Sequence, residues 1–133
     1  MKLSRKTDYG VMLVSLLKKS FETSIFVSLE KIAKENKLPL PFLEKLAESL
    51  RLKKILESRR GRSGGYRLLR DPKKITLKEL IDIFEEPLLM RCMKSNDPEK
   101  HCVYAAMCPT REVWSSVQDR IYKAFESVTV DAL

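Results

Sequence analysis

The sequence predicts a mainly α-helical fold with a small β-hairpin, arranged as a winged helix-turn-helix domain followed by a long C-terminal helix. Two short segments, 29–35 and 41–51, carry apolar residues at helical spacing and are separated by a proline-containing turn. A basic, glycine-containing stretch at 58–68 follows them and has apolar residues on both sides, as in a short hairpin. A longer helical stripe begins near Pro109.

The N-terminal segment 7–19 predicts a helix that is apolar around most of its circumference, and therefore buried on more than one side. Asp8 lies in its first turn, where a carboxylate complements the helix dipole. A polar break is expected at 20–24, followed by a short extended piece at 25–27. Ser28 can then cap the first helix of the helix-turn-helix.

The helix predicted from Pro41 to about Arg51 would enter the major groove of DNA with its N-terminus first. Four apolar residues would form its buried face: Leu43, Leu46, Ala47 and Leu50. Near the bases or phosphates we expect Pro41, Phe42 and Lys45, while Glu44 can accept a hydrogen bond from a cytosine amino group. The alternative is that this face is merely solvated.

The stretch from Ser58 to Leu68 predicts a hairpin with an arginine-rich tip, the wing. Its glycines permit backbone conformations that other residues avoid, and such a tip can lie along a phosphate backbone or enter a minor groove. The expected DNA contacts are Arg59, Arg60, Arg62, Ser63 and Gly64. The alternative is an ordinary solvated basic hairpin.

After the wing, Thr76 and Glu79 have the spacing of a capping box for a helix over 77–84. A long helix is then expected from Pro109, with an apolar stripe formed by Val113, Val117, Ile121, Ala124 and Val128. We interpret this helix as a dimerisation element that packs against its symmetry mate in coiled-coil-like fashion. The alternative is a helix folded back on its own domain.

Positive charge is concentrated between Arg51 and Lys74. This segment holds ten basic and two acidic residues, and the whole chain holds 26 and 18, so the segment and the chain both have a net charge of +8. The remaining residues, 16 of each sign, sum to zero. A charge this localised points to a polyanion as partner.

Length and composition indicate one compact domain with an appended element, since the 133 residues are 44% hydrophobic and 33% charged. No secretory cleavage site and no apolar run long enough to span a membrane are recognisable, which predicts a cytoplasmic protein without membrane contact. Enzymatic activity is not expected, because we find no nucleophile–base pair and no phosphate-binding glycine loop.

Three cysteines, Cys92, Cys102 and Cys108, lie in a region without a convincing period. An odd number of thiols cannot all pair within one chain, and no CxxC pair is present. Three thiolates on a loop can hold iron-sulfur iron or zinc with a fourth ligand from elsewhere. A thiol redox switch and unrelated buried cysteines are the alternatives. Cys108 precedes the long helix, whose dipole favours a thiolate.

With these features the chain resembles the IscR/NsrR family of transcription regulators, also called the Rrf-two family, over nearly its full length. The matching residues are Met1-Lys2-Leu3-Ser4, Asp8-Tyr9-Gly10, the wing from Ser58 to Leu68, Ile75-Thr76-Leu77, the three cysteines and Trp114. The resemblance implies a homodimeric winged-helix protein that binds palindromic promoter DNA. It also implies sensing of iron-sulfur status, nitric oxide or redox state through a cluster.

Position by position, the resemblance makes Arg60 and Arg62 DNA contacts and makes the three cysteines cluster ligands. IscR-like members carry a ligating histidine where this chain has Arg111, whereas Asp8 matches an acid that NsrR-like members donate from the partner subunit. We therefore expect a repressor with an iron-sulfur cluster, [2Fe-2S] rather than [4Fe-4S]. A regulator with a thiol or zinc switch, and an adaptor acting through the long helix, are the alternative functions.

The expected organisation has three parts. Residues 1–84 would form the winged helix-turn-helix domain, 85–108 the cysteine-containing cluster-binding loop, and 109–133 the dimerisation helix and tail.

Overall fold

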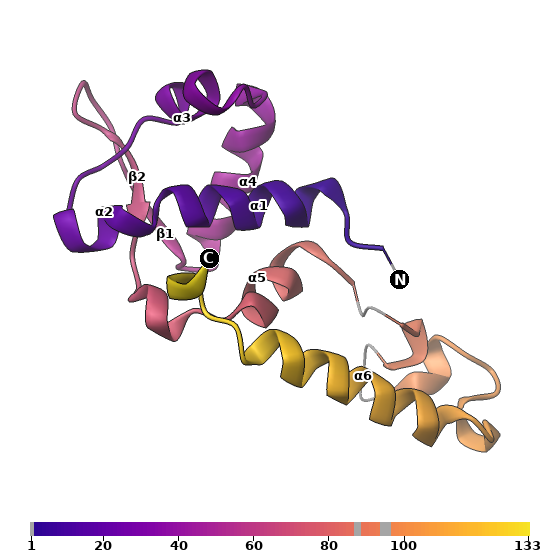
Figure 1. Ribbon diagram of the computed structural model, residues 1–133. Coiled ribbons are helices and arrows are strands. Elements are labelled where there is room, and N and C mark those ends of the chain that lie inside the picture. Colours follow the sequence, from indigo (N-terminus) through magenta and orange to yellow (C-terminus); the bar gives the residue numbers. More distant parts are fainter. Residues whose placement is uncertain (1, 87–88, 94–96) are drawn as a thin grey trace.

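The computed structural model describes residues 2–86, 89–93 and 97–133 (Figure 1). Its helices and strands are α1 (Arg5–Leu16), α2 (Lys18–Thr23), α3 (Leu29–Asn36), α4 (Leu40–Leu52), β1 (Leu56–Arg59), β2 (Gly65–Leu68), α5 (Leu77–Phe84) and α6 (Arg111–Glu126). Short 3-10 helices at Pro72–Lys74, Arg91–Met93, Pro98–Lys100, Ala105–Met107 and Val130–Ala132 complete the described chain. The predicted class, mainly helical with a small antiparallel sheet, is confirmed.

A single core lies beneath α1, α3, α4 and the hairpin. It contains Leu13, Val14 and Leu17 near the end of α1, all fully buried, and the four residues predicted for α4, Leu43, Leu46, Ala47 and Leu50, each at most 3% exposed. The apolar periodicity of α4 therefore identified its buried face. Pro41 stands in the first turn of α4, as expected, because its missing amide proton costs nothing there.

One residue outside the hairpin, Val27, pairs with strand β2 through an isolated antiparallel bridge. β1 and β2 pair antiparallel, with Leu56 opposite Leu68, and Val27 exchanges two backbone hydrogen bonds with Tyr66, at 2.8 and 2.9 Å. The predicted extended piece at 25–27 is thus confirmed. Gly65 has φ of 140°, and a Cβ there would lie 2.2 Å from the Val27 carbonyl oxygen, so this close approach requires glycine.

The predicted polar break at 20–24 is wrong, because α2 runs through most of it, to Thr23. The polar residues of this segment indicate a break, but Ser20 is buried in α2. The Ser20 hydroxyl donates to the Leu17 carbonyl and accepts from the Leu68 amide at 2.9 Å, so this polar side chain is satisfied inside the fold. The sequence pattern did not show this long-range partner.

The long helix also begins later than expected, at Arg111, while Pro109 lies in the preceding turn. Val128, assigned to its apolar stripe, lies beyond the end of α6 at Glu126, and its carbonyl accepts from the Leu77 amide at 2.8 Å. The tail then returns to the main core, where Val130 is fully buried.

α6 extends away from the winged domain and carries the cysteine-containing segments at its far, N-terminal end (Figure 1). Its C-terminal half lies beside α5, where the Lys78 ammonium is 4.7 Å from the centre of the Tyr122 ring. The division at 84 and 108 stays a prediction, and the loop 85–108 is described only in part. Within the described residues, no helix is long and apolar enough to cross a membrane.

Candidate DNA interface and cysteine loop

A groove brings the first turn of α4 together with the tip of the wing. It is lined by Ser28, Leu29, Glu30, Leu40, Glu44, Gly61, Arg62, Gly64, Gly65 and Tyr66. Two predicted contact residues from distant parts of the chain, Glu44 and Arg62, therefore face one open surface. Figure 1 shows the wing tip and the start of α4 on the same side of the domain.

Of the four predicted contact residues of α4, Glu44 lines this groove and Pro41, Phe42 and Lys45 do not. Pro41, Glu44 and Lys45 are exposed, whereas Phe42 is half-buried. The Phe42 ring packs edge-on against Tyr9 of α1, with ring centres 5.4 Å apart and planes inclined by 75°. Phe42 thus joins α4 to α1, a role that its position in the sequence did not indicate.

At the wing tip, the Gly64 amide donates to the Gly61 carbonyl at 3.0 Å, and a Cβ on Gly64 would lie 2.2 Å from the Arg59 carbonyl oxygen. This tight turn leaves the side chains of Arg60, Arg62 and Ser63 exposed. Neither Arg60 nor Arg62 makes an ion pair with any residue that the structure describes. They are therefore available to an anionic partner.

Arg59 differs from its two neighbours. Its guanidinium lies 4.4 Å from the centre of the Phe26 ring and donates to the Ser63 carbonyl at 3.3 Å. This stacking holds Arg59 against the body of the wing, so the residue shapes the tip as well as adding charge.

The basic segment 51–74 is not one continuous patch. Three of its arginines are paired with glutamates: Arg51 with Glu48 at 2.6 Å, Arg67 with Glu57, and Arg70 with Glu79. The other basic residues divide between the wing tip, the end of α4 with the exposed Lys53 and Lys54, and the 3-10 helix Pro72–Lys74 with the exposed Lys73 and Lys74. The unpaired charge nearest the groove is therefore that of the tip.

The start of α1 is anchored to the end of α5 by a carboxylate. Glu85 accepts hydrogen bonds from the Ser4 amide, at 2.6 Å, and from the buried Thr7 hydroxyl. Burial opposes its ionisation, but these hydrogen bonds outweigh it and hold the pKa of Glu85 below its ordinary value. The sequence indicated Glu85 only as the end of a helix, because nothing local shows a partner 81 residues away.

A second contact of the same pair of helices is steric. A Cβ on Gly10 would lie 2.3 Å from the Phe84 ring, so α1 approaches α5 at a distance that only glycine permits. The anchor and this contact together fix α1 to the element that leads into the cysteine-containing region.

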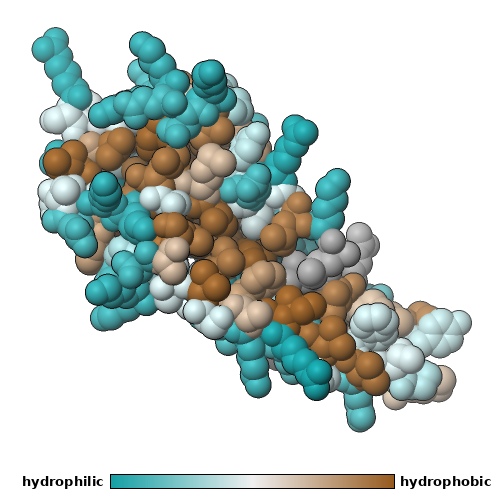
Figure 2. Space-filling model, viewed as in Figure 1, coloured by the Kyte–Doolittle hydropathy of each residue, from teal (hydrophilic) through white to brown (hydrophobic). Residues whose placement is uncertain are grey.

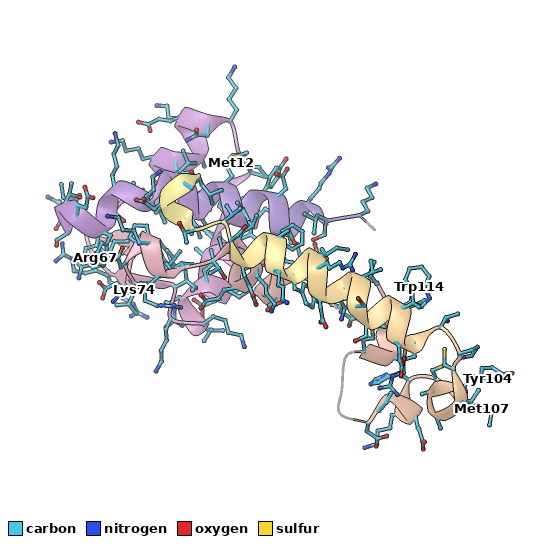
Figure 3. The ribbon with its side chains drawn as sticks, turned by 60° about the horizontal axis from the view of Figure 1, so that its bottom comes forward. Met12, Arg67, Lys74, Tyr104, Met107 and Trp114 are labelled. Carbon is cyan, nitrogen blue, oxygen red and sulfur yellow. The ribbon has the colours of Figure 1, made fainter. Side chains whose placement is uncertain are left out.

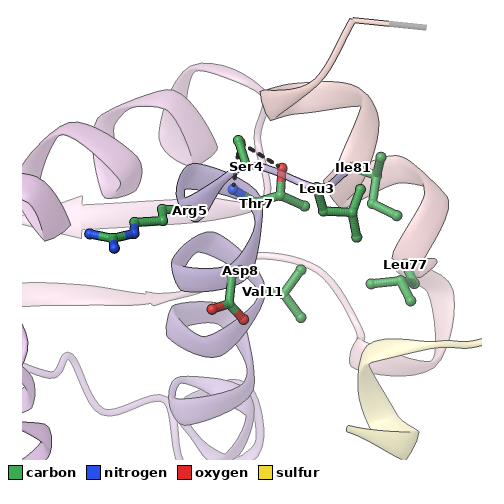
Figure 4. Close-up of a pocket in the computed structure, with 8 residues that line it drawn as sticks. All are labelled: Leu3, Ser4, Arg5, Thr7, Asp8, Val11, Leu77 and Ile81. Atoms are coloured by element: carbon green, nitrogen blue, oxygen red, sulfur yellow. Dashed lines mark hydrogen bonds between the residues drawn. The ribbon is translucent and has the colours of Figure 1, made fainter. Parts of the chain in front are cut away.

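Beside this junction, α1 and α5 enclose an open hollow lined by Leu3, Ser4, Arg5, Thr7, Asp8, Val11, Leu77 and Ile81. Figure 4 shows Leu3, Val11, Leu77 and Ile81 facing one another across it, with the Asp8 carboxylate to one side. Asp8 is exposed on α1, in the first turn, as the sequence indicated. The hollow is mainly apolar and open to solvent.

The three cysteines lie on or just after short helical turns. Cys92 is within Arg91–Met93, Cys102 follows Pro98–Lys100, and Cys108 follows Ala105–Met107. All three are free thiols and partly exposed. Among the described residues, no group of three or more His, Cys, Asp or Glu side chains is close enough to hold a metal ion. The donor types suit iron or zinc, but the described arrangement does not gather them into one ligand set.

Cys108 lies just before α6, and its sulfur is 3.5 Å from the Thr110 hydroxyl oxygen. Hydrogen bonds from the hydroxyl and the backbone amide of Thr110 hold the pKa of Cys108 below its ordinary value, with a smaller contribution from Arg111. The lowering has the direction expected for Cys108, but its main cause is hydrogen bonding with Thr110 and not the helix dipole named from the sequence.

The apolar stripe of α6 is mostly unpartnered in the single chain. Val113 is 63% and Val117 36% exposed, as is the neighbouring Trp114 at 39%, while Ala124 is exposed and Ile121 half-buried. Figure 2 shows apolar side chains continuing over the surface along this part of the molecule. In Figure 3, Trp114 projects from α6, and the exposed Tyr104 and Met107 lie at the end of the molecule remote from Arg67 and Lys74.

Comparison with known proteins gives consistent matches. A sequence model of the Rrf2 family, described as iron-dependent transcriptional regulators, matches residues 3–133. The HTH-type transcriptional regulator CymR of Bacillus subtilis is 32% identical over 135 aligned positions, which cover 100% of this chain and 89% of that protein.

Two solved structures have the same fold. IscR of T. potens aligns with a TM-score of 0.74 and 31% identity, covering 99% of this chain and 85% of its own. CymR of B. subtilis, described as the global cysteine regulator of that organism, aligns with a TM-score of 0.74 and 29% identity, covering 99% and 95%.

We predict that Cys108 reacts as a thiolate at lower pH than an ordinary cysteine, since a lowered pKa brings deprotonation to lower pH. In a variant with Cys92→Ser and Cys102→Ser, the pH midpoint of alkylation by iodoacetamide should lie below about 8.5. Adding Thr110→Val should raise that midpoint, whereas Ser116→Ala should not. The same midpoint with and without the Thr110 hydroxyl would show that this hydrogen bond does not tune the thiol.

Proposed function

Because the chain belongs to the Rrf2 family of transcriptional regulators, we propose that it acts as a homodimeric repressor whose DNA affinity depends on the chemical state of its cysteine loop. Its relatives are named as transcriptional regulators, and the chain is accordingly a DNA-binding regulator and not an enzyme. A cytoplasmic location goes with this function. The observation that carries the proposal is the groove in which the first turn of α4 meets the wing tip with its unpaired Arg62.

The proposed interface has two parts, α4 for reading bases and the wing for contacting the DNA backbone. Pro41, Glu44 and Lys45 at the exposed start of α4 would read base edges or adjoining phosphates in the major groove. The wing, with Arg60, Arg62, Ser63 and Gly64, would follow the backbone or enter the neighbouring minor groove, and Arg59 would support its shape. In a dimer, the two α4 helices would reach successive major grooves about 34 Å apart, which suits a palindromic site.

The dimer would form through the apolar face of α6. In the single chain Val113, Trp114 and Val117 are exposed, and the hollow between α1 and α5 is also apolar and open. In a symmetric dimer, the second copy presents the same apolar face of α6 and the same apolar hollow, so each of these surfaces on one copy can be covered by an apolar surface of the other. Packing of α6 on its mate would cover the stripe that Val113, Val117, Ile121 and Ala124 form, and Val128 would remain with its own winged domain.

The cluster remains the first candidate for the sensing chemistry. Cys92, Cys102 and Cys108 would hold a [2Fe-2S] cluster, with Asp8 of the second copy as the fourth ligand. The resemblance to the IscR/NsrR family, the iron-dependent description of the matched family and the three thiols on one loop support this assignment. A bound cluster would supply a centre sensitive to oxygen, nitric oxide and iron supply.

A thiol switch is the second candidate, and one observation favours it. Cys108 is partly exposed and its pKa is lowered, which are the properties of an oxidation-sensitive cysteine. The full-length relative CymR is described as a cysteine regulator. In this case the loop would respond by reversible oxidation, with no metal bound.

We predict that Arg60→Ala together with Arg62→Ala weakens DNA binding and leaves thermal unfolding unchanged, since both side chains are exposed and unpaired. The plot of log affinity against log salt should become less steep by about 0.9 for each phosphate that the variant no longer neutralises. The matched control, Lys73→Ala with Lys74→Ala, removes the same charge far from the groove and should keep the slope. If wild-type protein enriches no duplex from a random library, DNA binding itself is refuted and the adaptor function gains support.

The cluster assignment predicts that protein purified or reconstituted without oxygen contains iron and acid-labile sulfide in equal amounts and absorbs visible light. Each cysteine-to-serine change should abolish that absorption. Asp8→Ala should keep the cluster but make it more labile, while Glu22→Ala, an exposed acid on α2, should not. Iron-free protein with zinc, or with a reversible disulfide at Cys108, would instead support the second candidate.

A further inference from the structure

We propose that Lys2, Arg5 and Lys6, at the start of α1, form a second phosphate-binding surface on the side of the recognition helix opposite the wing. This inference rests on the proposed function, because it assumes that α4 enters a major groove. It extends the interface to residues to which neither the charge pattern nor the family resemblance assigned a role in DNA binding. The net charge outside segment 51–74 is zero, so these three residues did not stand out in the sequence.

The helical positions of the residues around α4 locate this surface. Leu40 and Glu44 line the groove that the wing borders, whereas Phe42 lines a different hollow together with Lys2, Arg5 and Lys6. Residues four apart lie on one face of an α-helix, and a residue two positions away lies roughly 160–200° around the axis. The wing and the three basic residues therefore lie on opposite sides of the first turn of α4.

The shape of the major groove explains why basic groups on both sides of α4 would be useful for binding DNA. A helix in the groove, about 12 Å wide, has a phosphate backbone on each side. The wing is suited to contact one of these sides. Long basic side chains on the opposite side of α4 are suited to contact the other, and they would fix the rotation of α4 about its own axis as well as add affinity.

The three residues stand on or next to a fixed support. Ser4 caps α1 through the Thr7 amide, and its own amide donates to Glu85, so the backbone from Ser4 to Thr7, which carries Arg5 and Lys6, is held at both ends. Lys2 lies two residues before this fixed point. The edge-on contact between Tyr9 and Phe42 holds α1 beside α4. Because the support is rigid, side-chain rotation alone would be needed to meet a phosphate.

The acidic residues of the same hollow reduce its positive charge but do not outnumber its basic residues. Glu85 keeps its negative charge, because the Ser4 amide and the Thr7 hydroxyl that donate to its carboxylate are neutral, and Lys6 contributes to lowering its pKa. Glu86 also lines the hollow and already has an interaction partner. All three basic side chains are exposed, and Arg5 forms no ion pair with any described residue. The hollow has three basic and two acidic residues, so its net charge is small. Phosphate binding here would therefore depend on the exposed positions of the three basic side chains and not on the net charge of the hollow.

The test begins with a duplex that wild-type protein selects from a random library. Affinity for this duplex is measured against salt concentration for the triple variant Lys2→Ala, Arg5→Ala, Lys6→Ala. The control triple variant Lys53→Ala, Lys73→Ala, Lys74→Ala removes the same charge from the end of α4 and from the 3-10 helix Pro72–Lys74, none of which lines either hollow. We expect the salt slope of the first variant to fall by about 0.9 per phosphate left without a cationic partner, with its sequence preference kept. The control should match wild type.

Position is tested first with wild-type protein, for which variant folding is not a concern, and then with the first triple variant. Single phosphates of the selected duplex are replaced by neutral methylphosphonates. Two sets of sensitive phosphates are expected, one on each side of the major groove, and only the set remote from the wing should become insensitive in the first triple variant.

Three results would overturn the inference. One is an equal decrease of affinity in both triple variants, which would indicate a bulk charge effect. Another is sensitivity to methylphosphonates on the wing side alone, which would leave the proposed DNA binding intact while removing the role of Lys2, Arg5 and Lys6. The third is the failure of wild type to select any duplex, which would remove the proposed function as well.

Discussion

The joint between α1 and α5 depends on the carboxylate of Glu85, which ties the start of α1 to the end of α5. This carboxylate, ionised at neutral pH, accepts from the Ser4 amide at 2.6 Å and from the Thr7 hydroxyl, and these hydrogen bonds hold its pKa below the ordinary value. Charge-assisted hydrogen bonds of this kind are stronger than neutral ones. The close approach of Gly10 to Phe84 makes the same joint tight. Everything that follows α5, including the cysteine region, therefore starts from a fixed point on α1.

From that joint a continuous set of contacts leads to the candidate DNA interface. Tyr9, one turn into α1, packs on Phe42 of α4, and Phe42 lies in the first turn of the helix that would read DNA. These contacts, which pack against the main core, link a displacement of α5 to the orientation of α4. Under the proposed function, the cysteine region would act on the interface along this route, through a shift between two arrangements of α1.

Local patterns in the sequence predicted the buried face of α4, the hairpin and α5 well, because periodicity, proline and glycine act over a few residues. They failed where a partner is remote in sequence. Ser20 can be buried in a helix because its hydroxyl accepts a hydrogen bond from the distant Leu68 amide. Val130 belongs to the core although it follows the cysteine-containing region and α6 in the sequence. Glu85, for the same reason, gave no local signal of its hydrogen bond with Ser4. For the candidate site, the wing was evident from charge, but the pairing of Arg51, Arg67 and Arg70 with glutamates was not.

The most direct test of this account measures how strongly the cysteine region controls DNA affinity when the joint is intact and when it is broken. DNA affinity is determined for protein reconstituted with iron and sulfide and for metal-free, reduced protein, in wild type and in Glu85→Ala. We predict a clear difference between the two states in wild type and a ratio close to one in the variant, with both proteins folded. An equal ratio in the two proteins would contradict the role assigned to the joint.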